Sequence, residues 1–462
     1  MTDFESFRKS FKGDVVTAKD EGYEQAIARW ALNAVRRARI VAYVKDAEDV
    51  ATALKYAKAN EIKIAICGGG HSPNGASSSE DGLIIDLSRY LNGVKVDPEK
   101  KLAYVQGGAK WGAVDKATMA HGLAMVAGTV SHTGVGGLTV GGGYGWLSPE
   151  HGLTIDHVRQ ATVVTADGAI RTANKTENPD LFWGIRGGGS NFGVVTEFVF
   201  QLYPQRKTVF GGPVIFGRDK LLDVAQLIDE WYPKASPKEA MHAIMGRAPD
   251  GTPALTLLTF YNGSEADGRQ AYKTFTDLGP VADMRGEMPY ETWNSMMDAF
   301  TPPGKCCWMR GVLTDDATKI ITYDAFDKVM DLFKDGPFRG SIGLEFLPHG
   351  KINSIPKEET PYRRNLPGNG ICLVMWDEHK PELEVKAKKL VDELSSMVKV
   401  PGMAYGNFSP DTEALPTAEG IVKPSRAKEL FGENYPKMQQ VKKKYDPDMM
   451  FNKWFVVHPV TD

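Results

Sequence analysis

The sequence predicts an α+β protein with two domains, one of them built on an antiparallel sheet covered by helices. A length of 462 residues exceeds the roughly 150 residues of a typical domain. Up to about residue 205, short helical and extended patterns alternate between glycine clusters. From 206 to 409, longer amphipathic helices alternate with strands. This change of pattern places the domain boundary near residue 205.

In the first part, apolar spacing and turn residues predict each element. Apolar residues recur at helical spacing within 46–60 and alternate over 62–66, which predicts a helix followed by a strand. A second strand is predicted in GLIIDLS, from Gly82. The remaining predicted elements are a hairpin with its turn at Asp97-Pro98, a helix over 111–121, a hairpin around Asp167-Gly168, a short helix capped by Asn178-Pro179, and the strand NFGVVTEFVFQLYP.

In the second part, helical stripes occupy 221–228 and 383–394. The segment 241–261 is typical of a hairpin, and SIGLEFLPHG and GICLVMWDEH are typical of strands. This order is best explained by an antiparallel sheet with helices on one face. The last fifty residues return to short helix and loop.

Composition and charge exclude several classes of function. The formal net charge is −3, which gives no electrostatic reason to expect nucleic acid or an anionic membrane as a partner. The N-terminus mixes charges and lacks the apolar run of a secretory signal or membrane span, so we expect a cytoplasmic protein. The four cysteines show no metal-ligand spacing, so we expect reduced thiols and no metal site.

Three glycine-rich segments carry the main functional signal: 67–75, 128–146 and 181–198. Consecutive glycines permit positive φ and expose backbone N–H groups that suit phosphate oxygens. Each segment alone is equally compatible with a tight turn or a helix-to-strand joint. Together and in order they indicate an extended ligand of dinucleotide size. None matches GxGxxG after a strand or GxxxxGK[ST], which argues against a Rossmann or P-loop site.

Five motifs then resemble one known family. They are GGGHSPNG, GVGGLTVGGGYGWLSPEHGLTIDHV, DLFWGIRGGGSNFGVVTEF, YGNFSPD and FGENYPKMQQVKKKYDPDMMFN, in this order over nearly the whole chain. The set is similar to the FAD-linked oxidases of the berberine bridge enzyme type, in the vanillyl-alcohol oxidase and p-cresol methylhydroxylase superfamily.

The resemblance implies a bipartite FAD-binding domain of the p-cresol methylhydroxylase type, formed by 1–205 and completed by 410–462, with a substrate-binding domain over 206–409 between its two parts. The flavin ring would lie at their interface. Because the family's GGH histidine joins the flavin, the resemblance implies FAD bound covalently through His71. From the residues alone, His71 is better interpreted as an ordinary polar histidine near a phosphate nest, and the resemblance reverses that preference.

The resemblance also implies the other cofactor contacts. The predicted FAD-binding residues are Gly68, Gly69, Gly70, His71, Ser72, Gly75, Val130, Gly134, Gly136, Gly137, Gly141, Gly142, Gly143, Tyr144, Gly145, Asp156, Gly193, Val194 and Asn452. Many relatives form a second link through a cysteine, and Val130 occupies that position here, so a single link is expected. Thr133 stands where a small apolar residue often borders the flavin, which bears on reactivity toward oxygen.

Four residues are candidates for substrate chemistry. Tyr405 and Asn407 match the family's Y-x-N motif, and a tyrosinate could accept a proton while hydride moves to flavin N5. With an ordinary pKa near 10, Tyr405 would need a cationic or hydrogen-bonding neighbour. Glu345, in an apolar strand, is either a paired or functional carboxylate or a solvent-facing one. His132 is a further candidate for a polar residue near the flavin.

Other residues are interpreted as structural. Trp376 shares a strand face with Cys372 and is expected in the core. Lys442 to Lys444 are interpreted as a solvated helix face, followed by a turn at Asp446-Pro447.

The sequence thus predicts an FAD-dependent oxidoreductase that oxidises a small alcohol, sugar hemiacetal or amine and passes electrons to dioxygen. Two alternatives stay open: a dehydrogenase of the same fold with another acceptor, and a flavin-binding protein without turnover.

Overall fold

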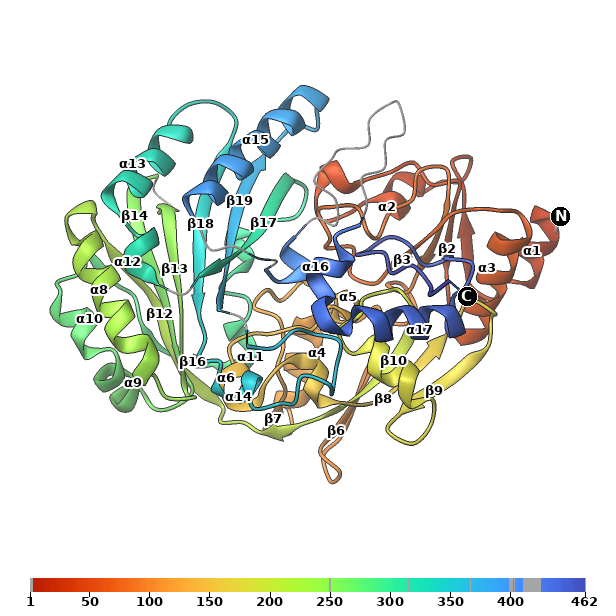
Figure 1. Ribbon diagram of the computed structural model, residues 1–462, viewed down its shortest axis with the longest axis horizontal. Coiled ribbons are helices and arrows are strands. Elements are labelled where there is room, and N and C mark those ends of the chain that lie inside the picture. Colours follow the sequence, from red (N-terminus) through yellow and green to blue (C-terminus); the bar gives the residue numbers. More distant parts are fainter. Residues whose placement is uncertain are drawn as a thin grey trace.

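A computed structural model describes residues 3–248, 251–314, 316–365, 367–398, 402, 404–409 and 425–461. The segment 410–424, which the sequence assigns to the FAD-binding domain, lies outside the described residues. Within the described part the chain is a mixture of helices and sheets, as predicted (Figure 1). The helix at 47–59 illustrates how local sequence sets an element, because the Asp46 carboxylate accepts a hydrogen bond from the Asp49 backbone N–H and caps its first turn. No described helix is both long and apolar enough to cross a lipid bilayer.

The N-terminal sheet has the strand order β1-β2-β4-β3, in which β2, β4 and β3 run parallel and β1 is antiparallel. Helix α3 connects β2 to β3 and buries its apolar side against this sheet together with α1. The bounds are α1 Phe4–Ser10, β1 Asp14–Val16, α2 Tyr23–Ile27, β2 Ile40–Tyr43, α3 Ala47–Ala59, β3 Ile64–Cys67 and β4 Leu83–Asp86.

A second, antiparallel sheet has the order β5-β6-β10-β8-β9. The predicted hairpins are present, with Asp97 opposite Leu102 in one and Val164 opposite Ile170 in the other. The strand that ends this part of the sequence, β10, lies in the middle of the sheet. The bounds are β5 Val94–Asp97, β6 Leu102–Gln106, α4 Trp111–Met119, β7 Leu123–Ala124, α5 Val135–Val140, α6 Ser148–His151, β8 Val158–Val164, β9 Ile170–Asn174, α7 Pro179–Ile185, β10 Val194–Gln201 and β11 Tyr203–Pro204.

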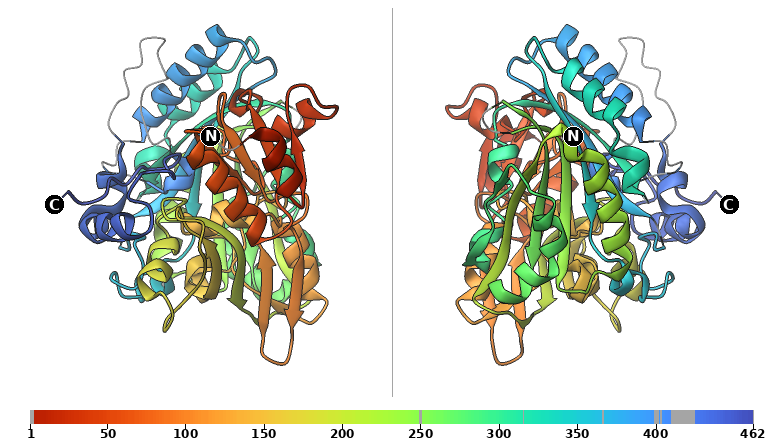
Figure 2. Two further views of the ribbon diagram at one scale, coloured as in Figure 1. Left: turned by 90° about the vertical axis from the view of Figure 1, so that its right-hand side faces the viewer. Right: turned by 90° about the vertical axis from the view of Figure 1, so that its left-hand side faces the viewer.

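A large antiparallel sheet has the order β15-β12-β14-β13-β18-β19-β17, with β16 also paired to β12. Helices α8, α13 and α15 cover one face, as predicted. They form the left-hand and upper layer in Figure 1, the side that is turned toward the viewer in the right view of Figure 2. Trp376 and Cys372 lie in that core, as expected. The strands are β12 Thr208–Phe216, β13 Glu239–Arg247, β14 Pro253–Tyr261, β15 Ala282–Asp283, β16 Gly286–Pro289, β17 Cys306–Thr314, β18 Arg339–Phe346 and β19 Gly368–Trp376. The helices are α8 Leu221–Trp231, α9 Glu265–Ala271, α10 Lys273–Asp277, α11 Tyr290–Trp293, α12 Ala317–Ile320, α13 Tyr323–Leu332, α14 Gly350–Asn353 and α15 Pro381–Met397.

The opposite face of this sheet points toward the first part of the chain. Side chains of a strand alternate between faces, so Met241 and Ala243 of β13 enter the helix-covered core while His242 and Ile244 face the other way. In the same way β18 directs Glu345 away from the helices. The sheet therefore supplies one wall of the site described below.

The C-terminal helices α16 (Ala427–Phe431) and α17 (Tyr435–Tyr445) return to the first part of the chain, where they share a hydrophobic core with β6, β8 and β10. The prediction that Lys442 belongs to a solvated face is wrong. Its ammonium group is fully buried and donates hydrogen bonds to the Asp446 carboxylate at 2.6 Å and to two backbone carbonyls. The helix turns this lysine inward because it follows Met438 and Val441 on the apolar stripe. The four cysteines are buried free thiols.

Candidate functional site

A cavity of about 1220 Å³ lies between the sheet face and the glycine-rich loops. Its wall includes the loop 68–78 after β3, the segment from Gly128 to Val140, and the C-terminal residues near Asn452. Pockets for single drug-sized ligands usually measure about 300–1,000 Å³. The cavity therefore has room for an extended ligand and a second small molecule.

The loop after β3 is held by close backbone packing. A Cβ atom on Gly69 would lie 2.5 Å from the Cα of Gly134, so neither loop tolerates a side chain at this crossing. Gly70 has φ of 65°, in the region that favours glycine. The glycines of the first motif thus bring two loops into contact as well as exposing backbone.

One part of the cavity wall carries buried polar atoms that have no hydrogen-bond partner among the described residues. These are Asn74 Oδ1, Ser77 Oγ and Ser78 Oγ, and the cations Arg36 and Lys63 line the same cavity. Buried polar groups are rarely left unpaired, so these atoms indicate a polar ligand. Hydroxyl and amide groups with nearby cations fit the ribose and diphosphate of a dinucleotide, and this is the chemistry that FAD would require.

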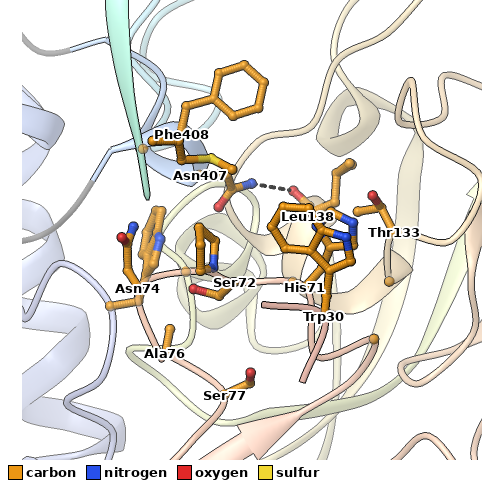
Figure 3. Close-up of a pocket in the computed structure, with 18 of the residues that line it drawn as sticks. Trp30, His71, Ser72, Asn74, Ala76, Ser77, Thr133, Leu138, Asn407 and Phe408 are labelled. Atoms are coloured by element: carbon orange, nitrogen blue, oxygen red, sulfur yellow. Dashed lines mark hydrogen bonds between the residues drawn. The ribbon is translucent and has the colours of Figure 1, made fainter. Parts of the chain in front are cut away.

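His71 follows this loop's glycines and lies in the cavity wall (Figure 3). The indole of Trp30 stacks on its imidazole, with ring centroids 4.3 Å apart and planes 9° apart. His71 Nε2 lies 3.1 Å from His132 Nδ1. Burial lowers the pKa of His71 to about 3, with a further contribution from His132. The imidazole is therefore neutral, with a nitrogen lone pair available, at physiological pH.

Glu345 projects into the cavity from β18 and is 5% exposed. It accepts a hydrogen bond from the Tyr144 hydroxyl and lies opposite His242 on the neighbouring strand, with 3.9 Å between His242 Nε2 and Glu345 Oε1. Burial raises the pKa of Glu345 to about 7, although the Tyr144 hydrogen bond opposes the shift. Burial also lowers the pKa of His242 to about 3. Near neutral pH, Glu345 can therefore accept a proton, and the His242 imidazole beside it is uncharged.

Tyr405 and Asn407 lie together at the cavity, as the Y-x-N motif predicts. The Tyr405 hydroxyl accepts hydrogen bonds from the Gly143 backbone N–H at 3.0 Å and from Asn407 Nδ2 at 2.7 Å. Asn407 also donates to the Leu138 carbonyl, the dashed line in Figure 3. Burial nevertheless raises the pKa of Tyr405 well above its ordinary value, with further contributions from Tyr362 and Glu345, and the two hydrogen bonds oppose this shift without cancelling it. The phenol is better suited to donate a hydrogen bond than to accept a proton.

The rest of the sheet-side wall is mainly apolar. Its side chains include Ile244, Met309, Ile371, Leu373 and Phe408. Among the described residues between 206 and 409, the wall contains the carboxylates Glu345 and Glu384 and no lysine or arginine. Such a wall suits an apolar ring with one polar function better than a polyanion. Across the described ranges, no group of His, Cys, Asp and Glu side chains is arranged to hold a metal ion.

Most of the residues singled out from the sequence come together here. Those that line the cavity are Gly68, Gly69, Gly70, His71, Ser72, Gly75, Val130, Thr133, Gly134, Gly136, Gly137, Tyr144, Gly193, Glu345, Tyr405, Asn407 and Asn452. Glu345 lies on an interior strand, which excludes the solvent-facing alternative.

Four glycines of the second motif, Gly141, Gly142, Gly143 and Gly145, lie outside the cavity wall. A Cβ on Gly141 would collide with the Asn407 amide, and one on Gly145 would lie 2.0 Å from a backbone oxygen. These glycines allow the chain to pack closely behind the site residues.

Asp156, Val194 and His132 also lie outside the wall. Asp156 is buried in a two-bond ion pair with Arg364, at 2.6 and 3.0 Å. Val194 points into the core of the N-terminal sheet because strand alternation turns only its neighbour Val195 toward the cavity. His132 does not line the cavity but contacts the His71 side chain directly.

Sequence reasoning did not single out several residues at the site, namely Trp30 and His242, and in the polar part of the wall Arg36, Lys63, Ser77 and Ser78. Trp30 lies in a segment without a motif, and only the fold brings it onto His71. His242 could have been identified from the sequence, because the alternation in MHAIM places it on the face of β13 opposite to the core residues.

Comparison with known proteins agrees with this geometry. A family model described as FAD binding domain matches residues 38–174, and one described as berberine and berberine like matches residues 404–453. The FAD-linked oxidoreductase pgmH of Aspergillus terreus is 31% identical over 477 aligned positions, covering 99% of this chain and 96% of the relative. The crystal structure of 6-hydroxy-D-nicotine oxidase from Arthrobacter nicotinovorans superposes with a TM-score of 0.85 at 25% identity, covering 97% of this chain and 98% of that one. A BBE-like protein of Arabidopsis thaliana shares the fold, with a TM-score of 0.85 at 22% identity over 99% of this chain and 100% of that one.

Proposed function

Because this chain belongs to the FAD-linked oxidoreductases of the berberine bridge enzyme type, we propose that it holds FAD along the cavity and oxidises a small organic substrate there. The observation that carries the proposal is the cavity itself, which joins unpartnered hydroxyl and amide groups, a neutral histidine and a buried carboxylate. The residues 1–205 with 410–462 would act as the FAD-binding domain, and 206–409 as the substrate-binding domain.

The cofactor contacts are assigned as follows. The loop 72–78 with Arg36 and Lys63 would bind the ribose and diphosphate, and His71 would bind the flavin methyl group covalently. A single link is proposed, since Val130 has no thiol. When bound, FAD supplies a two-electron acceptor at its N5 atom, and the protein supplies orientation and proton transfer.

Glu345 is proposed as the proton acceptor for the substrate. Its pKa of about 7 leaves it half deprotonated near neutral pH, whereas the Tyr405 phenol keeps its proton. Tyr405 and Asn407 would orient the substrate or the flavin by hydrogen bonds. Among alcohols, sugar hemiacetals and amines, the apolar wall favours a hydroxyl or amine on a largely apolar ring.

Dioxygen is proposed as the final electron acceptor. A dehydrogenase of the same fold remains the alternative within enzymes, and a flavin-binding protein without turnover remains the alternative outside them.

The first test is the purified protein itself. We expect visible flavin absorbance that stays with the polypeptide after acid precipitation, and hydrogen peroxide formed at the rate of substrate turnover. A screen of apolar ring alcohols and amines by anaerobic bleaching of the flavin would identify the substrate. A colourless precipitate contradicts the covalent link, and turnover without peroxide supports the dehydrogenase alternative.

Replacing His71 tests the link separately. His71→Ala should leave a folded protein whose FAD dissociates on acid precipitation, because the described residues of the cavity wall include no cysteine, and its other imidazoles, His242 and His458, belong to other segments of the wall. If flavin remains with the denatured variant, the attachment site lies elsewhere.

A further inference from the structure

We propose that His132 is the residue that accepts the proton released when His71 bonds to the flavin. This inference rests on the proposed function, because it assigns a role within formation of the covalent link. The observation behind it is the 3.1 Å contact between His71 Nε2 and His132 Nδ1.

One ring nitrogen of His71 faces His132, and the other is left to bond to the flavin. Trp30 covers a face of the imidazole, and its own indole N–H donates to the Thr301 carbonyl at 2.8 Å, which fixes the stack. With Nε2 directed at His132, Nδ1 is the nitrogen that remains for a bond to carbon. The ring orientation is therefore set before the link forms.

The proton balance of the reaction requires an acceptor at this position. Overall, His71 exchanges its N–H bond for a bond to the flavin methyl carbon, which loses one C–H bond. The two electrons and two protons released pass to dioxygen, which becomes hydrogen peroxide. For Nδ1 to attack with its lone pair, the imidazole proton must reside on Nε2, and that proton must leave as the new bond places positive charge on the ring. His132 Nδ1 is within hydrogen-bond distance to receive it.

The surroundings of His132 can stabilise the charge that it gains. Its other nitrogen, Nε2, is buried and lies 3.9 Å from Asp298 Oδ1. Ser131 anchors that carboxylate through its backbone N–H at 2.9 Å and its hydroxyl at 2.5 Å. Burial and Lys110 lower the pKa of His132, while Asp298 and the Thr301 backbone raise it, so the resting imidazole is neutral and able to accept a proton.

The test measures formation of the link and not turnover. The parent protein and its variants are produced in riboflavin-depleted cells, mixed with FAD, and sampled over time for flavin that survives acid precipitation. His132→Asn keeps an acceptor oxygen near the Nδ1 position but takes up no proton near neutral pH. We expect it to bind FAD normally and to form the link about a hundredfold more slowly, at the low end of general-base contributions. His121→Asn, an exposed histidine after α4, is the matched control and should leave the rate unchanged.

A second variant separates proton transfer from ring positioning. His132→Ala should also form the link slowly, and added imidazole should restore the rate in proportion to its basic form. A purely structural role for His132 would show no such rescue.

The outcomes are distinct. If His132→Asn matches the parent rate, or if His132→Ala binds FAD and imidazole restores nothing, the inference is wrong and the proposed function stands. If the parent binds FAD but never retains it after acid, the covalent link fails and this inference fails with it. Slow linkage in both variants with rescue by imidazole supports the assignment.

Discussion

At the scale of single residues, the site depends on how burial changes acid and base strength. Glu345 and Tyr405 face the same cavity, and burial raises the pKa of both. The shift brings the pKa of the carboxyl into the neutral range and moves the pKa of the phenol further above it. Two side chains that seem comparable as bases in the sequence are thus separated by one physical effect, which favours the carboxylate.

Glu345→Gln tests this separation. The amide keeps the size and the acceptor oxygen facing Tyr144 but removes the base, so we expect anaerobic reduction of the bound flavin to slow by about a hundredfold while flavin content is unchanged. Rapid-mixing absorbance measurements would record this. Glu150→Gln is the matched control, since Glu150 is also partly buried with a raised pKa but lies outside the cavity wall. Equal effects of the two substitutions would remove Glu345 from the reaction.

The pH dependence has a defined sign. Because the proton-accepting form of Glu345 is the carboxylate, the rate of flavin reduction in the parent should rise as pH increases through about 7 and then level off. The burial of Tyr405 predicts no second rise near pH 10. A rate that is flat between pH 6 and 8 would contradict this assignment.

At the scale of elements, the glycine-rich segments act by allowing two loops to meet. The loop after β3 and the loop before α5 touch at Gly69 and Gly134 with no room for a Cβ atom. The same crossing brings His71 and His132 together, although they are 61 positions apart in the sequence. The glycines therefore determine the position of the proposed attachment site.

Two alanine substitutions distinguish packing from ligand contact. Gly69→Ala should cost about 2 kcal/mol of unfolding free energy, because its Cβ meets rigid backbone. Gly137→Ala, at a cavity-lining position of α5 where a Cβ meets no protein atom within 4 Å, should leave stability unchanged and weaken FAD binding about tenfold. Urea unfolding and flavin titration measure the two effects. A stable Gly69→Ala protein with normal FAD binding would mean that the crossing is not required.

At the scale of the whole molecule, the C-terminal segment closes the cavity from the side of the first domain. Lys442 holds this segment, since its ammonium group joins Asp446 and the carbonyls of Asn191 and Phe451. The residues that follow, including Asn452 and Trp454, line the cavity. A buried ion pair thus connects the end of the chain to the ligand site.

Lys442→Met tests what this ion pair contributes to stability and to FAD retention. The substitution leaves the Asp446 carboxylate buried without its partner, so we expect a loss of about 3–5 kcal/mol in unfolding free energy and weaker FAD retention. Gln440→Ala, exposed on the same helix, should change stability by less than about 0.5 kcal/mol. A neutral Lys442→Met variant would show that the segment is held by its apolar contacts alone.

The sequence by itself determined the elements and the family. Apolar periodicity and turn residues predicted α3, the three hairpins and the strands β18 and β19 of the large sheet, because these depend on contacts between near neighbours in the chain. The motif order likewise predicted the cofactor class, and most of the residues that it singled out line the cavity.

Only the tertiary structure decided which of these residues meet. Whether Glu345 faced solvent or the interior depended on β13 and β19 lying on either side of β18, and the inward direction of Lys442 depended on what packs against α17. The contacts of His71 with Trp30 and His132 join three separate loops. Burial and contacts between distant segments arise only when the whole chain packs, and burial is what sets the ionisation of the residues at this site.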